Sequence, residues 1–219
     1  MGAIARSAAN LITTSGVVLK GAVNNDSFDN VTALPSAFSE DGITLISSQT
    51  ASASASISFT SGLTSTYKAY KFVFSNMHPA SNGGFQMNFS TDGGSNYNVT
   101  KTSSGFQAYH REDGSSPLLG GSWNELAQST GEQMIAGGSV VNSNDSGVSG
   151  SLTLFNPSST TYVKHYITVA NSFDTSSPPY AQNQFSAGYC NTTSAVNAVR
   201  FKFSSGNTDD GTIYLYGIK

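Results

Sequence analysis

The sequence is short of cysteine, of charge and of long apolar runs, and each shortage excludes a class of protein. Cys190 is the only cysteine among 219 residues, so an internal disulfide and a cysteine-rich metal site are both excluded. Charged residues make up 11% of the chain, where roughly 25% is usual. The net charge is −3 and the few lysines and arginines are scattered, so we do not expect binding to nucleic acid.

Apolar residues are too few and too dispersed for a membrane protein. They amount to 37% of the chain, and no run approaches the roughly 20 residues of a membrane-spanning helix. Residues 1–6 lack the basic start and the long apolar stretch of a secretory signal peptide. We therefore expect no membrane insertion and synthesis in a cytoplasm without a cleaved signal.

What the chain does contain is a series of short alternating segments, which predict β-strands. In residues 69–74 the alternation places Tyr70, Phe72 and Phe74 on one face. Further strands are expected at residues 43–47, 49–60, 85–89, 151–155, 162–169, 184–190, 198–203 and 212–218. In residues 49–56 small side chains recur on one face, which would permit close approach of another sheet or subunit.

The turns between these segments decide the fold class. Clusters of Gly, Asn and Asp separate the expected strands, and clean alternation favours antiparallel pairing with one buried face. The sequence therefore predicts an all-β protein, an antiparallel jelly-roll-like β-sandwich over residues 41–219. Residues 113–140 are ambiguous and could form a strand or a long functional loop.

Residues 1–40 differ from the rest because they are small, polar and irregular. Short apolar pieces recur in them, and each could add a strand to a partner or pack into a groove. These pieces include Val17, Val18, Leu19, Val31 and Leu34. We interpret the segment as an N-terminal arm that anchors a projecting β-domain, and the alternative is a disordered tail.

One local motif has a known counterpart. Residues 90–97, Ser-Thr-Asp-Gly-Gly-Ser-Asn-Tyr, resemble the Asp-box of sialidases, with Asn96 and Tyr97 in place of the usual Thr and Trp. The motif occurs once, whereas sialidase propellers repeat it. We interpret it as a hairpin in which Asp92 accepts hydrogen bonds from its own turn and Tyr97 packs back, without glycosidase activity.

No catalytic arrangement can be recognised, and we expect a protein that is not an enzyme. The adjacent carboxylates at 112–113 and 209–210 would point to opposite faces of an extended chain, and would not flank one bond at the ~5–9 Å of glycoside hydrolysis. His78, His110 and His165 are far apart and lack the spacing of metal ligands.

Three other possibilities are a calcium site, aromatic contacts to a glycan and a reactive cysteine. A calcium site is conceivable from loop oxygens, although solvated turn carboxylates are the favoured interpretation. Its candidate ligands are Asn144, Asp145, Asp209 and Asp210. Aromatic side chains in loop-rich sequence could stack on sugar rings of a host glycan or receptor, and the alternative is that they cap the ends of the core. These residues are Trp123, Tyr109, His110 and Tyr180. Cys190 is expected to be a small buried residue and not a reactive thiol.

Three stretches together resemble a family of structural proteins of tailed bacteriophages. They are residues 12–35, which contain Ile-Thr-Thr-Ser-Gly-Val and Asn-Val-Thr-Ala-Leu-Pro, residues 58–79, and the ending Gly-Thr-Ile-Tyr-Leu-Tyr-Gly-Ile-Lys at 211–219. The resemblance implies a β-sandwich virion protein, often a homotrimer, on a fibre, spike or capsid surface. It supplies no catalytic residue and no cofactor.

The sequence and the resemblance together lead to one favoured function. We expect a tail or head fibre or receptor-binding protein on the virion surface, whose N-terminal arm contacts other virion proteins. The first alternative is a capsid decoration (cement) protein. A carbohydrate-binding module or a depolymerase is a further alternative from another class.

Overall fold

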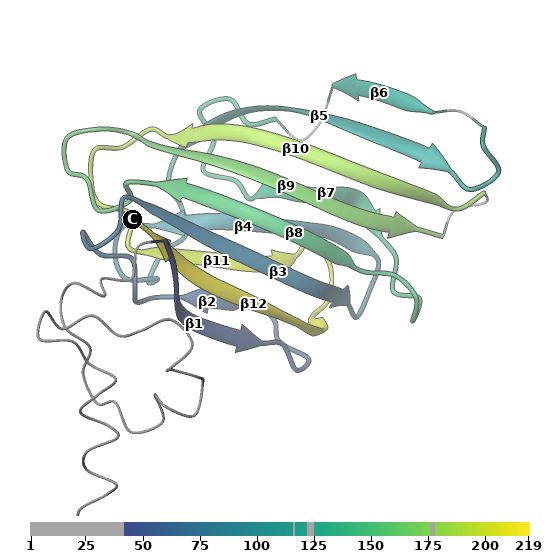
Figure 1. The fold of residues 1–219 in the computed structure, drawn as a ribbon, viewed down its shortest axis with the longest axis horizontal. Helices are drawn as coiled ribbons and strands as arrows, with labels where there is room; N and C mark the ends of the chain where they lie inside the picture. The colour runs from purple at the N-terminus through teal and green to yellow at the C-terminus, as the bar shows by residue number, and fades with distance from the viewer. Residues whose placement is uncertain (1–41, 116, 122–124, 176–177) are drawn as a thin grey trace, which may run out of the picture. The chain divides into compact units, whose positions relative to one another are not determined.

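The computed structural model describes residues 42–115, 117–121, 125–175 and 178–219, and these residues form an antiparallel β-sandwich with no helix (Figure 1). This confirms the predicted fold class. The arm residues expected to dock on a partner lie outside the described part of the chain. They are Val17, Val18, Leu19, Val31 and Leu34.

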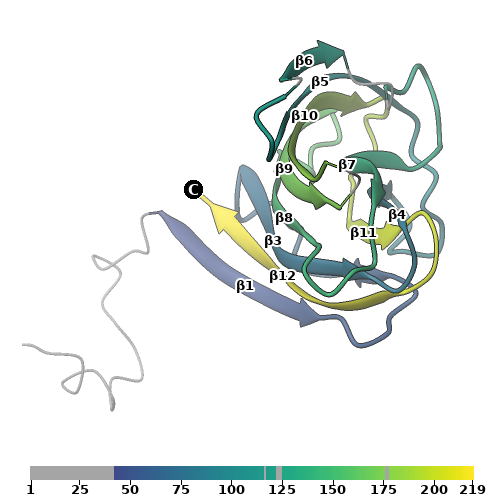
Figure 2. The same cartoon turned by 90° about the vertical axis from the view of Figure 1, so that its right-hand side faces the viewer.

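Two sheets make up the sandwich, and every neighbouring pair of strands is antiparallel. The larger sheet contains, in spatial order, β1 (Ile43–Thr50), β12 (Thr208–Ile218), β3 (Ala69–Pro79), β8 (Val148–Phe155), β9 (Lys164–Asp174), β10 (Tyr180–Cys190), β5 (Lys101–Arg111) and β6 (Leu118–Gly121). The smaller sheet contains β2 (Ile57–Phe59), β11 (Ala198–Phe203), β4 (Gly83–Ser90) and β7 (Gln133–Val140). Figure 2 shows the larger sheet curving around the smaller one.

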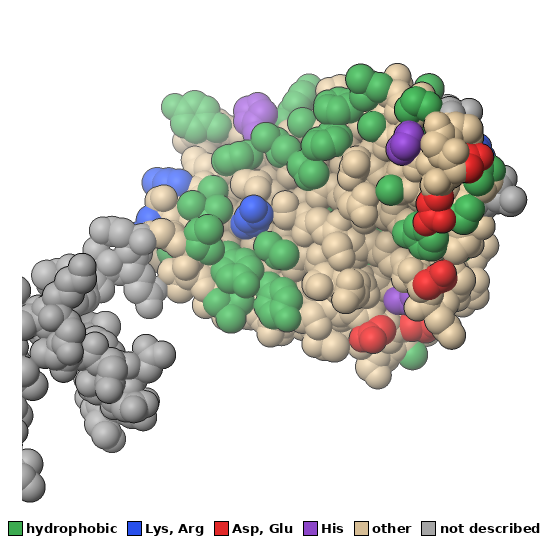
Figure 3. Space-filling view, turned by 45° about the vertical axis from the view of Figure 1, so that its right-hand side comes forward, with side chains coloured by type: hydrophobic (Ala, Val, Ile, Leu, Met, Phe, Trp, Pro, Cys, Tyr) green, Lys and Arg blue, Asp and Glu red, His purple; other side chains and the backbone are tan. Residues whose placement is uncertain are grey.

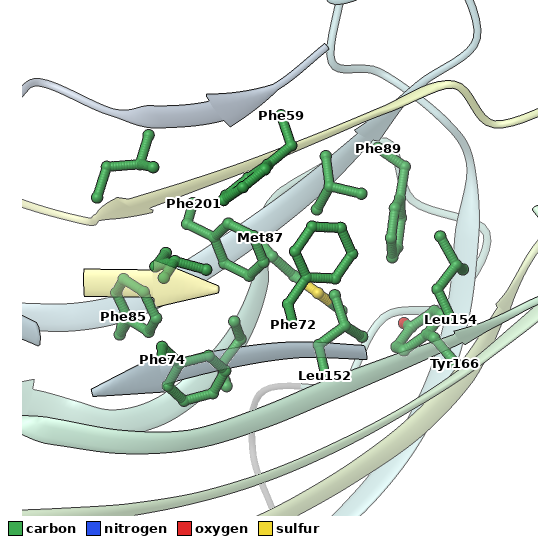
Figure 4. Packing of buried hydrophobic residues seen from close by; sticks show 14 of the residues in the cluster. Phe59, Phe72, Phe74, Phe85, Met87, Phe89, Leu152, Leu154, Tyr166 and Phe201 are labelled. Atoms are coloured by element: carbon green, nitrogen blue, oxygen red, sulfur yellow. The ribbon is translucent and has the colours of Figure 1, made fainter. Parts of the chain in front are cut away.

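An aromatic cluster fills the space between the sheets (Figure 4). Phe72 of β3 lies 5.3 Å from Phe59 of β2 and 5.4 Å from Phe201 of β11, measured between ring centroids. Phe85 of β4 stacks on Phe201 at 6.0 Å. The alternation predicted for residues 69–74 and 85–89 is confirmed, because Tyr70, Phe72, Phe74, Phe85, Met87 and Phe89 are all fully buried. Burial of these large rings is the main source of the stability of the fold.

The interior beneath β9, β10 and β5 is polar instead. Gln107, Gln182 and Gln184 are buried there, and the amide of Gln182 donates to Oε1 of Gln107 at 2.7 Å. On the neighbouring strand β9, Ser172 is also buried. Buried amides must satisfy one another through hydrogen bonds, so this half of the sandwich is held by a polar network as well as by packing.

The two ends of the larger sheet differ in which parts of the chain they contain. At one end, here called the terminal end, the backbone N–H of Lys219 donates to the carbonyl of Gly42 at 3.3 Å. At the opposite end, here called the distal end, β3 finishes at Pro79, β9 at Asp174 and β5 at Arg111. The distal end is on the right in Figure 1. Residues that enter and leave the described domain are therefore neighbours, far from the distal loops.

Two predicted segments were assigned wrongly. The tract at 49–56 is not one strand: β1 ends at Thr50, Ala53 has a positive φ of 49°, and the chain crosses from the larger to the smaller sheet. Its small side chains do pass close to another strand, since the backbone of Ser54 forms a bridge with Thr208. The cluster at 209–211 was expected to be a turn, but it lies inside β12, where two shifts of register absorb it.

Other strands were missed or extend further than predicted. Strand β5 was not predicted. It contains Tyr109 and His110, which were expected in a loop. The ambiguous residues 113–140 contain both β6 and β7. Strand β4 is buried on both faces. A loop covers its second face, and the amide of Asn88 donates to the carbonyl of Thr130 in that loop at 3.0 Å. In this strand, the alternation of apolar and polar residues therefore does not indicate a solvent-exposed face.

Candidate functional site

The distal end contains a wide polar depression, here called the distal pocket. Its volume is about 630 Å³, which is within the range of ligand pockets of about 300–1,000 Å³. Strands β3, β8, β9 and β12 and the loop before β8 contribute its lining. The lining residues are Asn76, His78, Asn144, Asp145, Ser146, Gly147, Ser149, Asn171, Phe173 and Asp210. Amides, hydroxyls and carboxylates dominate, and Phe173 is the aromatic member.

Strand geometry positions the side chains of the pocket. Asn76 has a positive φ of 51°, and its backbone N–H donates to Oγ of Ser149 at 3.0 Å. The register of β3 with β8 shifts between Phe74 and Met77, so Asn76 lies in an irregular part of the ladder. The irregularity places an ordinary strand residue in the lining of the pocket.

His78 joins the pocket to the loops around it. Its Nε2 lies 3.0 Å from the carbonyl oxygen of Ser143, and its Nδ1 lies 3.6 Å from a carboxylate oxygen of Asp209. His78 and Pro79 are the last two residues of β3. His78 therefore ties the end of β3 to the loop before β8 and to β12.

An aromatic pair lies at the same end of the sheet, on β5 and β10. The ring centroids of Tyr109 and Tyr180 are 5.3 Å apart, and the guanidinium of Arg111 lies 5.9 Å from the centroid of Tyr180. The hydroxyl of Tyr180 donates to Oδ2 of Asp174 at 2.8 Å. Burial, and then the bond to Asp174, raise the pKa of Tyr180 to about 12. The hydroxyl therefore stays protonated and acts as a fixed donor.

Carboxylates gather at the distal end, as Figure 3 shows by the red side chains on its right. They follow β5 (Glu112 and Asp113), precede β8 (Asp145), end β9 (Asp174) or lie near the start of β12 (Asp209 and Asp210). Arg111 is the one lysine or arginine that the described chain places beside them. Hydrogen bonds from Ser115 hold the pKa of Asp113 below its usual value. The distal end is therefore negatively charged at neutral pH.

The aromatic residues predicted as glycan contacts lie in different parts of the chain's structure or outside its described residues. Tyr109 and Tyr180 come together and are half-buried, which places them at the rim of the interior. His110 pairs with Ala181 on the opposite, outer face of the sheet and does not join them. Trp123 lies outside the described residues. The structure thus brings together two of the four predicted residues.

The candidate calcium ligands are partly assembled. Asn144, Asp145 and Asp210 line one pocket, with Asp209 next to it. Among the residues with described positions, however, no group of three or more His, Cys, Asp or Glu side chains is arranged to hold a metal ion. The arrangement offers polar contacts without a recognisable metal centre.

The paired carboxylates at 112–113 and 209–210 do not converge. They follow β5 and lie within β12, and strands β3, β8, β9 and β10 separate β5 from β12 in the sheet. A glycosidase requires two carboxyl groups on either side of one bond. These two pairs do not provide that arrangement.

The segment resembling an Asp-box is a rigid connection and not a hairpin, because it joins β4 of the smaller sheet to β5 of the larger one. Asp92 accepts hydrogen bonds from the hydroxyl of Ser90 at 2.7 Å and from the backbone and side chain of Asn96 at 2.9 and 2.7 Å. These bonds, that from Ser90 first, lower the pKa of Asp92 to about 2. Tyr97 packs on Arg200, whose guanidinium lies 4.5 Å from the ring centroid.

Cys190 is buried, as predicted, and lies between two buried lysines. It pairs with Lys101 of β5 and Lys164 of β9 in the ladders. Burial raises the pKa of the Cys190 thiol to about 12, although the two lysines oppose the shift. A thiol in this state is a poor nucleophile at neutral pH.

Sequence reasoning missed most of the pocket. Asn76, Ser149 and Asn171 come from three different strands and carry no motif. The available signals were Asn144, Asp145 and Asp210, which the calcium hypothesis had already singled out. In the described ranges, no helix is long and apolar enough to span a membrane. No family model, curated protein or solved structure matches this chain.

Proposed function

We propose that this chain is a non-enzymatic structural protein of a tailed-bacteriophage virion, a tail or head fibre or receptor-binding protein. Residues 1–40 attach it to other virion proteins, and the β-sandwich presents its distal end to the host surface. The bacteriophage assignment rests on the sequence resemblance. The geometry of the described domain supplies the orientation.

The position of the first and last residues of the described domain is the observation that carries the proposal. Gly42 and Lys219 are hydrogen-bonded neighbours at the terminal end, while the distal pocket and the Tyr109–Tyr180 pair lie at the opposite end of the same sheet. A domain held from its N-terminal side therefore turns its loops, pocket and aromatic pair away from the attachment. This is the arrangement expected of an adhesive head.

The chemistry of the distal end supports binding and not catalysis. Its carboxylates come from separated strands, its histidine is engaged by Ser143 and Asp209, and its aromatic hydroxyl is fixed by Asp174. Multiple copies on one particle would turn weak individual contacts into firm attachment.

Two measurements on intact particles test the proposal. Gold-labelled antibody against the β-sandwich should decorate tail fibres or head fibres of the virion, and Fab fragments against the distal loops should reduce adsorption to host cells. Absence of the protein from purified virions contradicts the proposal. Release of reducing sugar from host polysaccharide by the purified chain would instead favour the depolymerase alternative.

A capsid decoration protein is the second candidate, and the outer face of the larger sheet favours it. Phe106, Ile167 and Val169 are 47%, 48% and 40% exposed on that face, and Phe106 stacks on Phe185 at 4.7 Å. Contact with a shell or with neighbouring copies would cover these side chains. Copy number separates the candidates, because decoration proteins follow the many lattice points of a capsid and tail fibres are few.

A further inference from the structure

Three residues that line the distal pocket have side-chain oxygen atoms left to accept hydrogen bonds. The side chain of Asp145 makes no hydrogen bond to any other described residue, and Asp210 uses only Oδ1, which accepts from the N–H of Gly211 at 2.7 Å. The amide nitrogen of Asn171 already donates to two oxygen atoms of β10, at 3.0 and 3.1 Å. Its carbonyl oxygen is left to accept. A ligand matched to these oxygen atoms must bring hydrogen-bond donors.

The lining is held in place before any ligand arrives. Oγ of Ser146 donates to the carbonyl of Phe173 at 2.9 Å, which fixes the loop before β8 against β9. Ser149 is bonded to Asn76, and His78 is bonded to the carbonyl of Ser143. A preformed site loses little conformational entropy on binding, so even modest contacts give measurable affinity.

Charge restricts the ligand further. Asp145 and Asp210 line the pocket, Asp209 precedes Asp210 in β12 and Asp174 ends β9, whereas Arg111 ends β5. At physiological ionic strength charges act over about 8 Å. A carboxylate or sulfate group entering the pocket would meet the like charges of Asp145 and Asp210, and no lysine or arginine lines the pocket to offset them.

We propose that the distal pocket binds an uncharged, hydroxyl-rich carbohydrate and excludes polysaccharides that carry carboxylate or sulfate groups. Sugar hydroxyls donate to Asp145, Asp210 and Asn171, and Phe173 offers an apolar surface to the face of a sugar ring. This inference rests on the adhesive function proposed above and names the class of ligand for it. The pocket is the part of the surface where these acceptors and an aromatic ring coincide.

A binding panel with the full chain tests the inference. The probes are three neutral polysaccharides, dextran, mannan and laminarin, and three acidic ones, dextran sulfate, alginate and polygalacturonate. We expect retention on at least one neutral probe and on none of the acidic probes at low ionic strength. Asn171→Ala should weaken the neutral interaction about 3- to 10-fold, because it removes one acceptor.

Charge variants separate electrostatic exclusion from simple misfit. Asp145→Asn with Asp210→Asn keeps the shape of the lining and removes two charges, so affinity for acidic probes should rise about tenfold at low salt. Glu125→Gln is the control, since the Glu125 carboxylate faces the backbone N–H of Gly105 at 3.4 Å and does not line the pocket. It should change neither interaction. Melting curves of the two charge variants should overlap that of the parent chain.

Two results would overturn the inference. One is acidic probes binding as tightly as neutral ones, and the other is no retention on any neutral probe. Gold labelling of virions decides the proposed function separately, so a chain found on fibres that binds no neutral glycan would refute the ligand class alone.

Discussion

Lys101 permits a quantitative prediction, because it is a charged side chain in a fully buried position. Its ammonium donates to Oδ1 of Asn88 at 2.6 Å and to the carbonyl of Val99 at 2.8 Å, and its exposed fraction is 0%. No carboxylate is hydrogen-bonded to the ammonium in the described chain. Burial therefore lowers the pKa of Lys101 from 10.5 to about 8.

The lowered pKa fixes both the size and the sign of a pH effect on stability. A shift from 10.5 to about 8 corresponds to a burial penalty of roughly 3 kcal/mol at neutral pH, at 1.36 kcal/mol per pKa unit. Between those two values the unfolded chain binds more protons than the folded chain, so the free energy of unfolding rises with pH. The penalty is present below pH 8 and has disappeared above pH 10.5.

The substitution Lys101→Met removes the charge and keeps most of the volume. Asn88 Oδ1 retains its bond from the N–H of Phe89 at 2.9 Å, so this acceptor keeps a partner. Replacing a buried charge with an apolar side chain of similar size is often neutral or stabilising. The measured quantity is the free energy of unfolding of the variant minus that of the parent. We expect it to fall by about 2–3 kcal/mol between pH 7 and pH 10, because only the parent loses a burial penalty in that range.

Urea unfolding of both proteins at pH 7, 8, 9 and 10 measures this difference. Lys202→Met, at a half-buried position of β11, is the control for the loss of a lysine side chain. A flat difference for Lys101→Met, or one that grows with pH, would refute the argument that burial of the ammonium opposes folding.

Three further predictions concern the core, one loop and the thiol. Phe201→Ala should lower the free energy of unfolding by about 3–5 kcal/mol in urea titrations, because it opens a cavity at the centre of the aromatic cluster. Tyr162→Ala, at a side chain that is 69% exposed, should change it by less than about 0.5 kcal/mol. Asp92→Ala should lower the melting temperature at pH 7, and the difference should vanish as pH falls from 3.8 through about 2, because the native pKa of this carboxyl is lowered. Cys190 should be unreactive toward a thiol reagent in the folded protein and react once in urea, and rapid reaction of the native protein would contradict its burial.

The strands that could be predicted are those with apolar side chains on the inner face. The segment at 198–203 coincides with β11 (Ala198–Phe203), because its alternating apolar residues face the aromatic core. Strand β5 was missed for the opposite reason. Its inner face carries Gln107 and Tyr109, which meet the amides and ring of β10 and give no apolar period.

The candidate site was predictable only in part, because its residues meet through long-range register. Tyr109 and Tyr180 could be singled out as aromatics in polar sequence, but their contact depends on the pairing of β5 with β10. Asn76 contributes through an irregularity in the pairing of β3 with β8. Local sequence cannot specify which strands become neighbours, and so it cannot specify a pocket that several strands build.

The hydrogen bond between Gly42 and Lys219 also guides protein engineering. A fluorescent protein or affinity tag fused after Lys219 would emerge beside the segment that precedes Gly42 and would crowd any attachment made there. A foreign peptide is better inserted at Gly114, where the turn between β5 and β6 has a positive φ of 76° and open space around it. Joining Lys219 to Gly42 with a short linker, in a chain without residues 1–41, and opening the chain at that turn would give a circular permutant with its free ends on the far side of the domain.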